Sequence, residues 1–268
     1  MSERPSSISA IDTHTHLNHP RLLRRLDQAL ARAREAGVSQ MIVVGYDLPS
    51  SETAAALARQ HPRLYASVGV HPHDAGGVSE GALARLRELA GGERVVAIGE
   101  TGLDFYRELA PREAQIQSFR RHLALAAELG LPAIVHCREA QDALLETLTA
   151  RKSELPSLIW HCFDGTREQA DTALALGAFL GFGGALTYPG GEEMREVASA
   201  APEGRILTET DCPYLSPEPR RGRDNEPANL TFVTDRLAAL RRMPMPALAA
   251  VTAENARRVF SLPEESNG

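Results

Sequence analysis

The chain has 268 residues, 43% of them hydrophobic and 24% charged, and no stretch is long and apolar enough to cross a bilayer. Its formal net charge of −6 argues against nonspecific coating of nucleic acid, which depends on many Lys and Arg contacts to phosphate, but is compatible with a local basic or metal-bearing site. The three cysteines are too few for a disulfide framework, and residues 1–10 lack the basic-then-apolar order of a secretory signal, so we expect a cytoplasmic protein.

Short apolar runs alternate with longer amphipathic segments along the chain. The runs are rich in branched residues and predict eight strands, at 8–11, 40–45, 64–70, 95–99, 132–136, 157–161, 178–184 and 205–210. Helical patterns lie between them, and those at 20–37 and 111–130 each end at a glycine, as a helix C-cap does. Because continuous apolar runs are typical of parallel strands, the pattern predicts a closed (β/α)8 TIM barrel, with an open doubly wound sheet as the alternative.

No sequence feature marks a domain boundary within the chain. The sequence has no internal repeat, low-complexity tract or linker. We therefore expect residues 1–268 to form a single domain, with frayed ends at about 1–7 and 263–268.

Side chains that bind metals follow most of the predicted strands. In a parallel barrel the carboxyl ends of the strands meet at one rim, where the active sites of such barrels lie. Five histidines and two carboxylates fall there: His14 and His16 after the first strand, His71 after the third, Glu100 after the fourth, His136 after the fifth, His161 after the sixth and Asp211 after the eighth. One such histidine could be an ordinary polar residue at the start of a loop. Seven ligands at one rim suit two divalent ions, which a bridging carboxylate holds roughly 3.5 to 4 Å apart.

Eight segments in chain order resemble the TatD family of metal-dependent hydrolases, within the wider amidohydrolase-like barrels. They are IDTHTHL (11–17), GVHPH (69–73), GETGLDFY (99–106), PAIVHCR (132–138), WHCFDG (160–165), TETDCPYL (208–215), RGRDNEP (221–227) and TAENARRVF (252–260). Thr101 departs from the family, which often carries isoleucine there.

The resemblance also implies how the ligands divide. It implies that His14, His16 and Asp211 hold one metal, that His136 and His161 hold a second, and that Glu100 bridges both. It implies further that Asp211 orients or deprotonates the attacking water, so Asp211 and Glu100 are the predicted catalytic residues. Many related barrels use a carboxylated lysine as the bridge. The only lysine here, Lys152, lies before the sixth predicted strand, so Glu100 takes that place and Schiff-base chemistry in the barrel is disfavoured.

Two more carboxylates and three cysteines lie beside these ligands. By the two-residue alternation of a strand, Asp12 shares a face with His14 and His16, and Glu209 shares one with Asp211. Asp12 and Glu209 either fix the tautomers of metal-bound imidazoles or fill the upper layer of the barrel as polar side chains. The same alternation turns away the cysteines that follow predicted ligands, so none is predicted to bind metal: Cys137, Cys162 and Cys212.

The identity of the metals follows only in part from the ligands. Four imidazoles favour Zn²⁺ or Mn²⁺, whereas Mg²⁺, the ion expected of many nucleases of this family, prefers oxygen donors. We expect two divalent ions, Mg²⁺ or Mn²⁺ for activity, with Zn²⁺ able to occupy the same site.

Basic side chains near the rim predict a phosphate-containing substrate. Arg138 shares the strand face of His136, and its guanidinium matches phosphate in a bidentate fork. Arg221 and Arg223 follow the eighth strand, where they either contact neighbouring phosphates or belong to a solvated basic loop. His71 either binds the substrate phosphate or donates a proton.

The aromatic residues predict a short contact with nucleic acid. Tyr106 and Phe163 fall near the mouth and could stack a base, but with aromatics at 5% a continuous stacking platform is not expected. Two metals can clamp the attacking and leaving oxygens of a phosphodiester, and the resemblance implies a 3′–5′ exonuclease acting on DNA, or also RNA. We expect single-stranded ends as substrate, since an acidic chain suits a few nucleotides better than a long duplex.

Two other functions remain open at this point. The alternative enzyme is a metal-dependent hydrolase of a small-molecule amide, ester or lactone, because two-metal barrels also support carbonyl chemistry. The alternative from another class is a metal-storing or protein-binding module without turnover. It is disfavoured because structural metal sites close their coordination, whereas this rim has a carboxylate placed to serve an open one.

Overall fold

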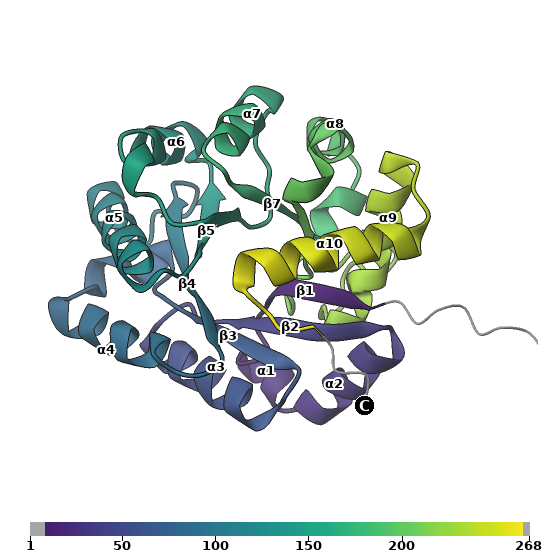
Figure 1. Ribbon diagram of the computed structural model, residues 1–268, viewed down its shortest axis with the longest axis horizontal. Helices are drawn as coiled ribbons and strands as arrows, with labels where there is room; N and C mark the ends of the chain where they lie inside the picture. The colour runs from purple at the N-terminus through teal and green to yellow at the C-terminus, as the bar shows by residue number, and fades with distance from the viewer. Residues whose placement is uncertain (1–8, 265–268) are drawn as a thin grey trace, which may run out of the picture.

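Eight parallel strands follow one another around a barrel in chain order, each paired with the next (Figure 1). The computed structural model describes residues 9–264, so Ile8 and the expected frayed residues 1–7 and 265–268 lie outside the described part. The strands are β1 (Ala10–Thr15), β2 (Val38–Val44), β3 (Leu64–Val68), β4 (Val95–Asp104), β5 (Ala133–Arg138), β6 (Leu158–Trp160), β7 (Phe179–Phe182) and β8 (Ile206–Thr208). The predicted single-domain (β/α)8 barrel is confirmed, and the alternative prediction of an open doubly wound sheet is wrong.

The barrel closes between β1 and the segment that follows β8. The backbone N–H of Asp211 donates to the carbonyl of His14 at 2.9 Å, and that of His16 donates to the carbonyl of Cys212 at 2.8 Å. Thr15 and Cys212 form a parallel bridge at the same place. The first and last predicted ligand segments are therefore neighbours.

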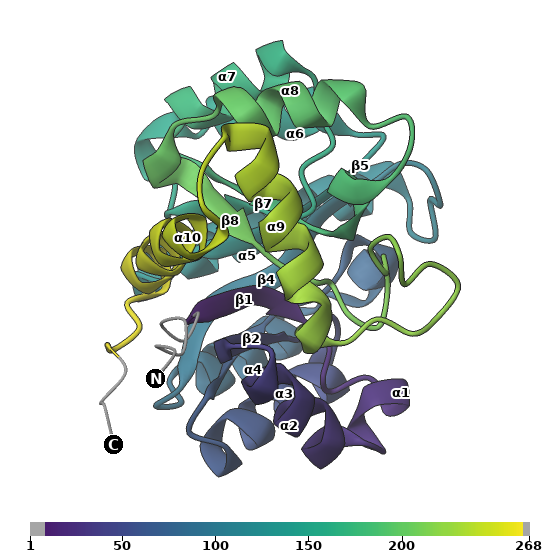
Figure 2. The same cartoon turned by 90° about the vertical axis from the view of Figure 1, so that its right-hand side faces the viewer.

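Ten α-helices are described, and most of them cover the outside of the barrel (Figures 1 and 2). They are α1 (Pro20–Leu23), α2 (Leu26–Glu35), α3 (Leu48–Gln60), α4 (Glu80–Ala90), α5 (Arg112–Leu129), α6 (Gln141–Thr149), α7 (Arg167–Ala175), α8 (Glu192–Ala200), α9 (Leu230–Arg241) and α10 (Met245–Phe260). No helix within residues 9–264 has the length and apolar character that a bilayer crossing requires.

One predicted helix is confirmed and another is broken. α5 ends at Gly130, whose φ of 65° is the left-handed cap that the sequence predicted. The single helix predicted at 20–37 is wrong. The His19 side chain accepts a hydrogen bond from the Arg21 N–H and caps a four-residue helix. Arg25, with φ −130° and ψ 28°, leaves the helical conformation, so a second helix, α2, begins after it.

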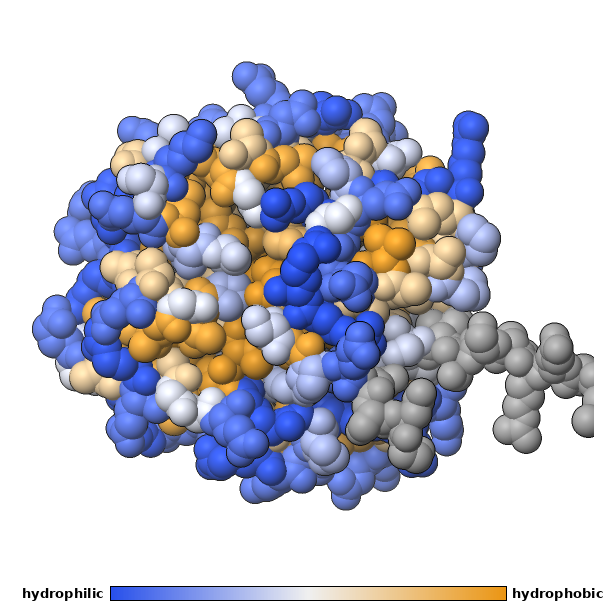
Figure 3. All heavy atoms as spheres, viewed as in Figure 1, coloured by the Kyte–Doolittle hydropathy of each residue, from blue (hydrophilic) through white to orange (hydrophobic). Residues whose placement is uncertain are grey.

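The apolar core has two layers, one inside the barrel and one between the strands and the helices. Inward-facing strand residues such as Ile42, Ile134 and Phe179 pack with Ala256 and Phe260 of α10. α10 crosses and closes the amino end of the barrel, and α1 lies at the opposite end (Figure 2). On the closed face, hydrophilic residues lie over the middle and apolar residues show between the surrounding helices (Figure 3). The only end left for a site is the one at which the strands finish.

Candidate metal centre

Glu100 is placed inside the barrel by an irregularity in β4. The register with β5 shifts between Ile98 and Thr101, and the Glu100 N–H donates to the carbonyl of Gly45 at 2.8 Å. Gly99 has a φ of +136°, and a Cβ there would lie 2.6 Å from a backbone oxygen of β5, so glycine is required. The strand predicted to end at Gly99 continues to Asp104, and the Glu100 carboxylate is buried within it.

One oxygen of Glu100 faces three imidazoles. Oε1 lies 2.9 Å from Nδ1 of His136, 2.9 Å from Nε2 of His161 and 3.7 Å from Nε2 of His71. The two nearer nitrogens, on His136 and His161, are 3.2 Å apart. Nitrogen lone pairs and a carboxylate oxygen that converge in this way require a positive charge between them, either a proton or a cation.

The other oxygen of Glu100 faces a second group of ligands. Oε2 lies 3.5 Å from Nε2 of His14 and 3.7 Å from Nε2 of His16. The same two nitrogens lie 3.7 and 3.3 Å from Oδ1 of Asp211. All six predicted ligands are therefore brought together, in two groups that share Glu100, and imidazole with carboxylate is a donor set that suits divalent ions.

The charges in this cluster favour a cation. Burial by itself raises the pKa of the Glu100 carboxyl, but the contacts that outweigh it, led by the charge of His161, hold the pKa well below its usual range. Burial also opposes ionisation of Asp211, yet the hydrogen bond with His16 leaves its pKa lowered. Burial lowers the pKa of His14 and takes that of His71 well below 6.5, so both rings are neutral. Nδ1 of His71 accepts the His73 N–H at 3.1 Å, so its Nε2 carries the proton and faces the cluster as a donor, whereas His14 can offer a lone pair.

The two further carboxylates named from the sequence lie in different places. Oε1 of Glu209 lies 3.6 Å from Nδ1 of His161, on the side of the ring away from Glu100. Asp12 accepts from the N–H and hydroxyl of Thr210, at 2.9 and 2.6 Å, and from the His14 N–H at 3.3 Å. Nδ1 of His14 has no hydrogen-bond partner among the described residues. Asp12 therefore contacts backbone and hydroxyl donors and no imidazole nitrogen, which favours its interpretation as a polar side chain in the upper layer of the barrel.

Cys162 departs from the predicted outward orientation. β6 ends at Trp160 and Cys162 has a φ of 45°, so strand alternation does not reach it. Its Sγ lies within 4.8 Å of a ring nitrogen of His161 and of a Glu209 oxygen. Burial raises the pKa of the Cys162 thiol well above its usual value, so the sulfur stays protonated. Cys137 and Cys212 pack in the outer apolar layer.

Asp104 and His73 belong to the site, although the sequence analysis gave them no role. Oδ2 of Asp104 lies 2.8 Å from Nε2 of His73 and 3.5 Å from Nε2 of His136. Oδ1 accepts the N–H groups of Tyr106 and Arg107, at 3.1 and 2.8 Å. The available signal was the two-residue alternation from Glu100 through residue 102 to Asp104, which a strand ending at 99 concealed.

The predicted substrate residues lie around the open side of the cluster. His71, His136 and Asp211 have side chains 13, 17 and 12% exposed, against 5% or less for the other ligands, so this is the side that solvent reaches. Arg138 and Arg221 are exposed, with the guanidinium carbons 3.9 and 4.0 Å from the ring centres of Tyr106 and Tyr188 respectively.

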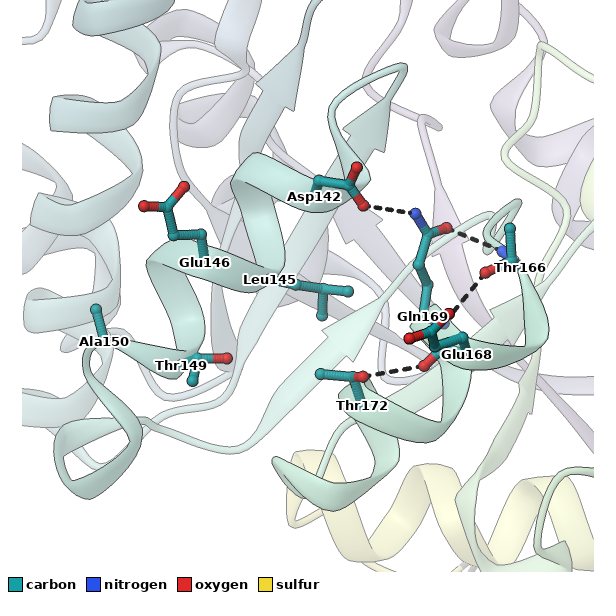
Figure 4. A pocket seen from close by; sticks show the side chains of 9 residues that line it. All are labelled: Asp142, Leu145, Glu146, Thr149, Ala150, Thr166, Glu168, Gln169 and Thr172. Atoms are coloured by element: carbon teal, nitrogen blue, oxygen red, sulfur yellow. Dashed lines mark hydrogen bonds between the residues drawn. The ribbon is translucent and has the colours of Figure 1, made fainter.

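The two remaining predicted contacts differ from each other. Arg223 is exposed in the loop after β8, as predicted. Phe163 is fully buried between Trp160 and Phe182, so the prediction that it stacks a base is wrong. A groove of about 750 Å³ lies between α6 and α7, and none of the predicted ligands or substrate residues lines it (Figure 4). Its polar side chains bond one another, for example Gln169 to Asp142 at 2.9 Å.

A (β/α)8 barrel with imidazole and carboxylate ligands at its carboxyl rim is typical of metal-dependent hydrolases. Comparison with known proteins narrows this class: the family model described as TatD related DNase matches residues 11–261. The chain belongs to the TatD family.

Individual relatives match over nearly the whole chain. A protein of Erwinia tasmaniensis named 3′-5′ ssDNA/RNA exonuclease TatD is 42% identical over 94% of this chain and 99% of its own length. The uncharacterized metal-dependent hydrolase YabD of Bacillus subtilis is 38% identical over 94% of this chain and 98% of its own. Among solved structures, YJJV, a TatD homolog from Escherichia coli, has a TM-score of 0.91 at 31% identity and covers 96% of this chain and 100% of its own.

Proposed function

We propose that this protein is a two-metal phosphodiesterase that removes nucleotides from the 3′ end of single-stranded DNA, and also of RNA. Its membership of a nuclease family and the names of its relatives support the reaction and the substrate. The observation that carries the proposal is the position of Glu100, whose two oxygens each face a separate group of imidazoles beside the open side of the barrel.

In this proposal the two groups of ligands hold one ion each. His14, His16 and Asp211 would hold the first, His136 and His161 would hold the second, and Glu100 is placed to serve both groups. When bound, divalent ions lower the pKa of water and neutralise charge on phosphoryl oxygens. We propose Mg²⁺ or Mn²⁺ as the activating ion, with Zn²⁺ also accepted by this donor set.

The side chains around the ions divide the remaining work. Asp211 has a lowered pKa, so it is ionised at neutral pH and accepts the proton of the attacking water. Glu209 and Asp104 fix the rings of His161 and His136 from behind. The phosphates of the chain are held by His71, Arg138, Arg221 and Arg223.

The test is digestion of one single-stranded oligonucleotide labelled in turn at its 3′ and its 5′ end. Metal-stripped protein receives Mg²⁺, Mn²⁺ or Zn²⁺, beside Glu100→Ala and the matched surface variant Glu146→Ala of α6. We expect metal-dependent loss of the 3′ label, at least about 10²-fold slower in Glu100→Ala and unchanged in Glu146→Ala. Measured metal occupancy near two without cleavage by any ion would refute the nuclease and favour a small-molecule hydrolase.

A further inference from the structure

The large apolar side chains that are most exposed within residues 9–264 all lie at the open end of the barrel. They are Leu23, Tyr106, Leu109, Tyr214 and Leu215, at 37 to 66% exposure. Leu23 belongs to the short helix after β1, the next two to the loop after β4, and the last two to the loop after β8. Apolar side chains gathered at one place on a surface mark a binding site.

An arginine guanidinium lies over the ring of each exposed tyrosine of this set. The guanidinium carbon of Arg138 lies 3.9 Å from the ring centre of Tyr106, and that of Arg21 lies 5.4 Å from the ring centre of Tyr214. Arg21 is also bound to Asp224 at 3.0 Å, whereas Arg138 has no ion pair within the described chain. Since the rings are still 54 and 42% exposed, part of each remains open to a ligand. An exposed ring beside a guanidinium suits a planar base attached to a phosphate.

The two tyrosine–arginine pairs lie one on each half of the metal cluster. The Tyr106 N–H donates to Asp104, which contacts His136, and Arg138 ends the strand that carries His136. On the other half, the ring of Tyr214 lies 5.9 Å from that of His16. The Tyr214 N–H also donates to the backbone carbonyl of Asp211 at 2.9 Å. A nucleotide chain that crosses the metal cluster would therefore pass one pair on each side.

We propose that the Tyr106–Arg138 and Tyr214–Arg21 pairs stack the two bases that flank the phosphodiester bond to be cut. This inference rests on the proposed nuclease function and adds the residues that recognise the substrate. Stacking needs the open face of an unpaired base, so these pairs select single strands over duplex. Because every base has an aromatic face, the recognition tolerates any sequence.

The experiment compares two oligonucleotides with identical phosphates. One has ordinary bases at the two terminal positions, and the other has abasic tetrahydrofuran residues there. Release of the first nucleotide is measured for wild type, Tyr106→Ala, Tyr214→Ala and the ring-retaining Tyr106→Phe and Tyr214→Phe. Glu146→Ala on the exposed face of α6 serves as the surface control, and thermal unfolding checks that every variant folds.

The expected result is a rise in KM of about five- to a hundredfold for each alanine variant on the ordinary oligonucleotide, with kcat within about twofold of wild type. On the abasic oligonucleotide the tyrosine-to-alanine variants match wild type. The phenylalanine variants and Glu146→Ala match wild type on both substrates. The proposal is overturned if the alanine variants cleave the ordinary oligonucleotide as wild type does, or lose equally on both substrates. In either case wild-type cleavage persists, whereas failure of the proposed function would leave wild type unable to cut any oligonucleotide.

Discussion

Replacing Asp104 by asparagine tests whether this carboxylate fixes the His136 ring for metal binding. The variant keeps the size of the side chain and an oxygen for the N–H groups of Tyr106 and Arg107, so the loop after β4 should stay in place. It removes the negative charge that His73 contacts at 2.8 Å and His136 at 3.5 Å.

The magnitude follows from the contact with His136 alone, because His73 is not among the proposed ligands. Removing a carboxylate that lies behind a metal-binding histidine weakens metal affinity by roughly ten- to a hundredfold, which is about 1.4–2.7 kcal/mol. The ion held by His14, His16 and Asp211 keeps its affinity, because Asp104 does not contact that group.

Calorimetric titration of metal-stripped protein with Mn²⁺ measures both affinities separately. Asp104→Asn should show one unchanged and one weakened site, with cleavage reduced in parallel. Asp171→Asn, which breaks an exposed pair with Arg167 on α7, is the matched control and should change neither. Two unchanged sites in a folded Asp104→Asn protein would refute the reasoning.

Three further predictions concern other parts of the molecule. Cys162→Ser should keep the full metal stoichiometry, since the buried thiol stays protonated; loss of one ion by atomic absorption would contradict this. Gly102→Ala should lower the free energy of unfolding by more than about 3 kcal/mol in urea, because φ is +138° and the new Cβ would meet the carbonyl of His136 at 2.0 Å; a stable variant would be the contrary result. Burial lowers the pKa of His122 from 6.5 to about 4, and its Nε2 accepts the Val70 N–H. The unfolded chain therefore binds this proton below pH 6.5 while the folded chain does not. Stability contributed by the neutral ring should fall by about 3 kcal/mol from pH 7 to pH 4, and His122→Gln should show a shallower pH dependence; parallel curves would disprove it.

The sequence was sufficient for features that repeat along the chain. Apolar runs bounded by breakers located all eight strands, although β1 extends to Thr15 and so contains His14. The ligands predicted after six of these runs located the rim, because in a parallel barrel every strand points the same way. Features that depend on contacts between distant segments were not accessible. The irregularity at Gly99 is set by packing against β5, so the strand was ended too early and Asp104 was overlooked. Phe163 was misplaced because its burial depends on residues of β6 and β7 together.

Formation of the metal centre depends on closure of the seam between β1 and the segment after β8. His14 and Asp211, joined there by a backbone hydrogen bond, stand near opposite ends of the sequence, and α10 closes the barrel from still later in the chain. Contacts so remote in sequence form slowly, since a long loop must close first. A nascent chain that ends before α10 already contains both sides of the seam but lacks the helix that packs against β1 and β8. Under the proposed function, an ion at His14, His16 and Asp211 would stabilise the closed barrel by linkage, so that a chelator should speed its opening.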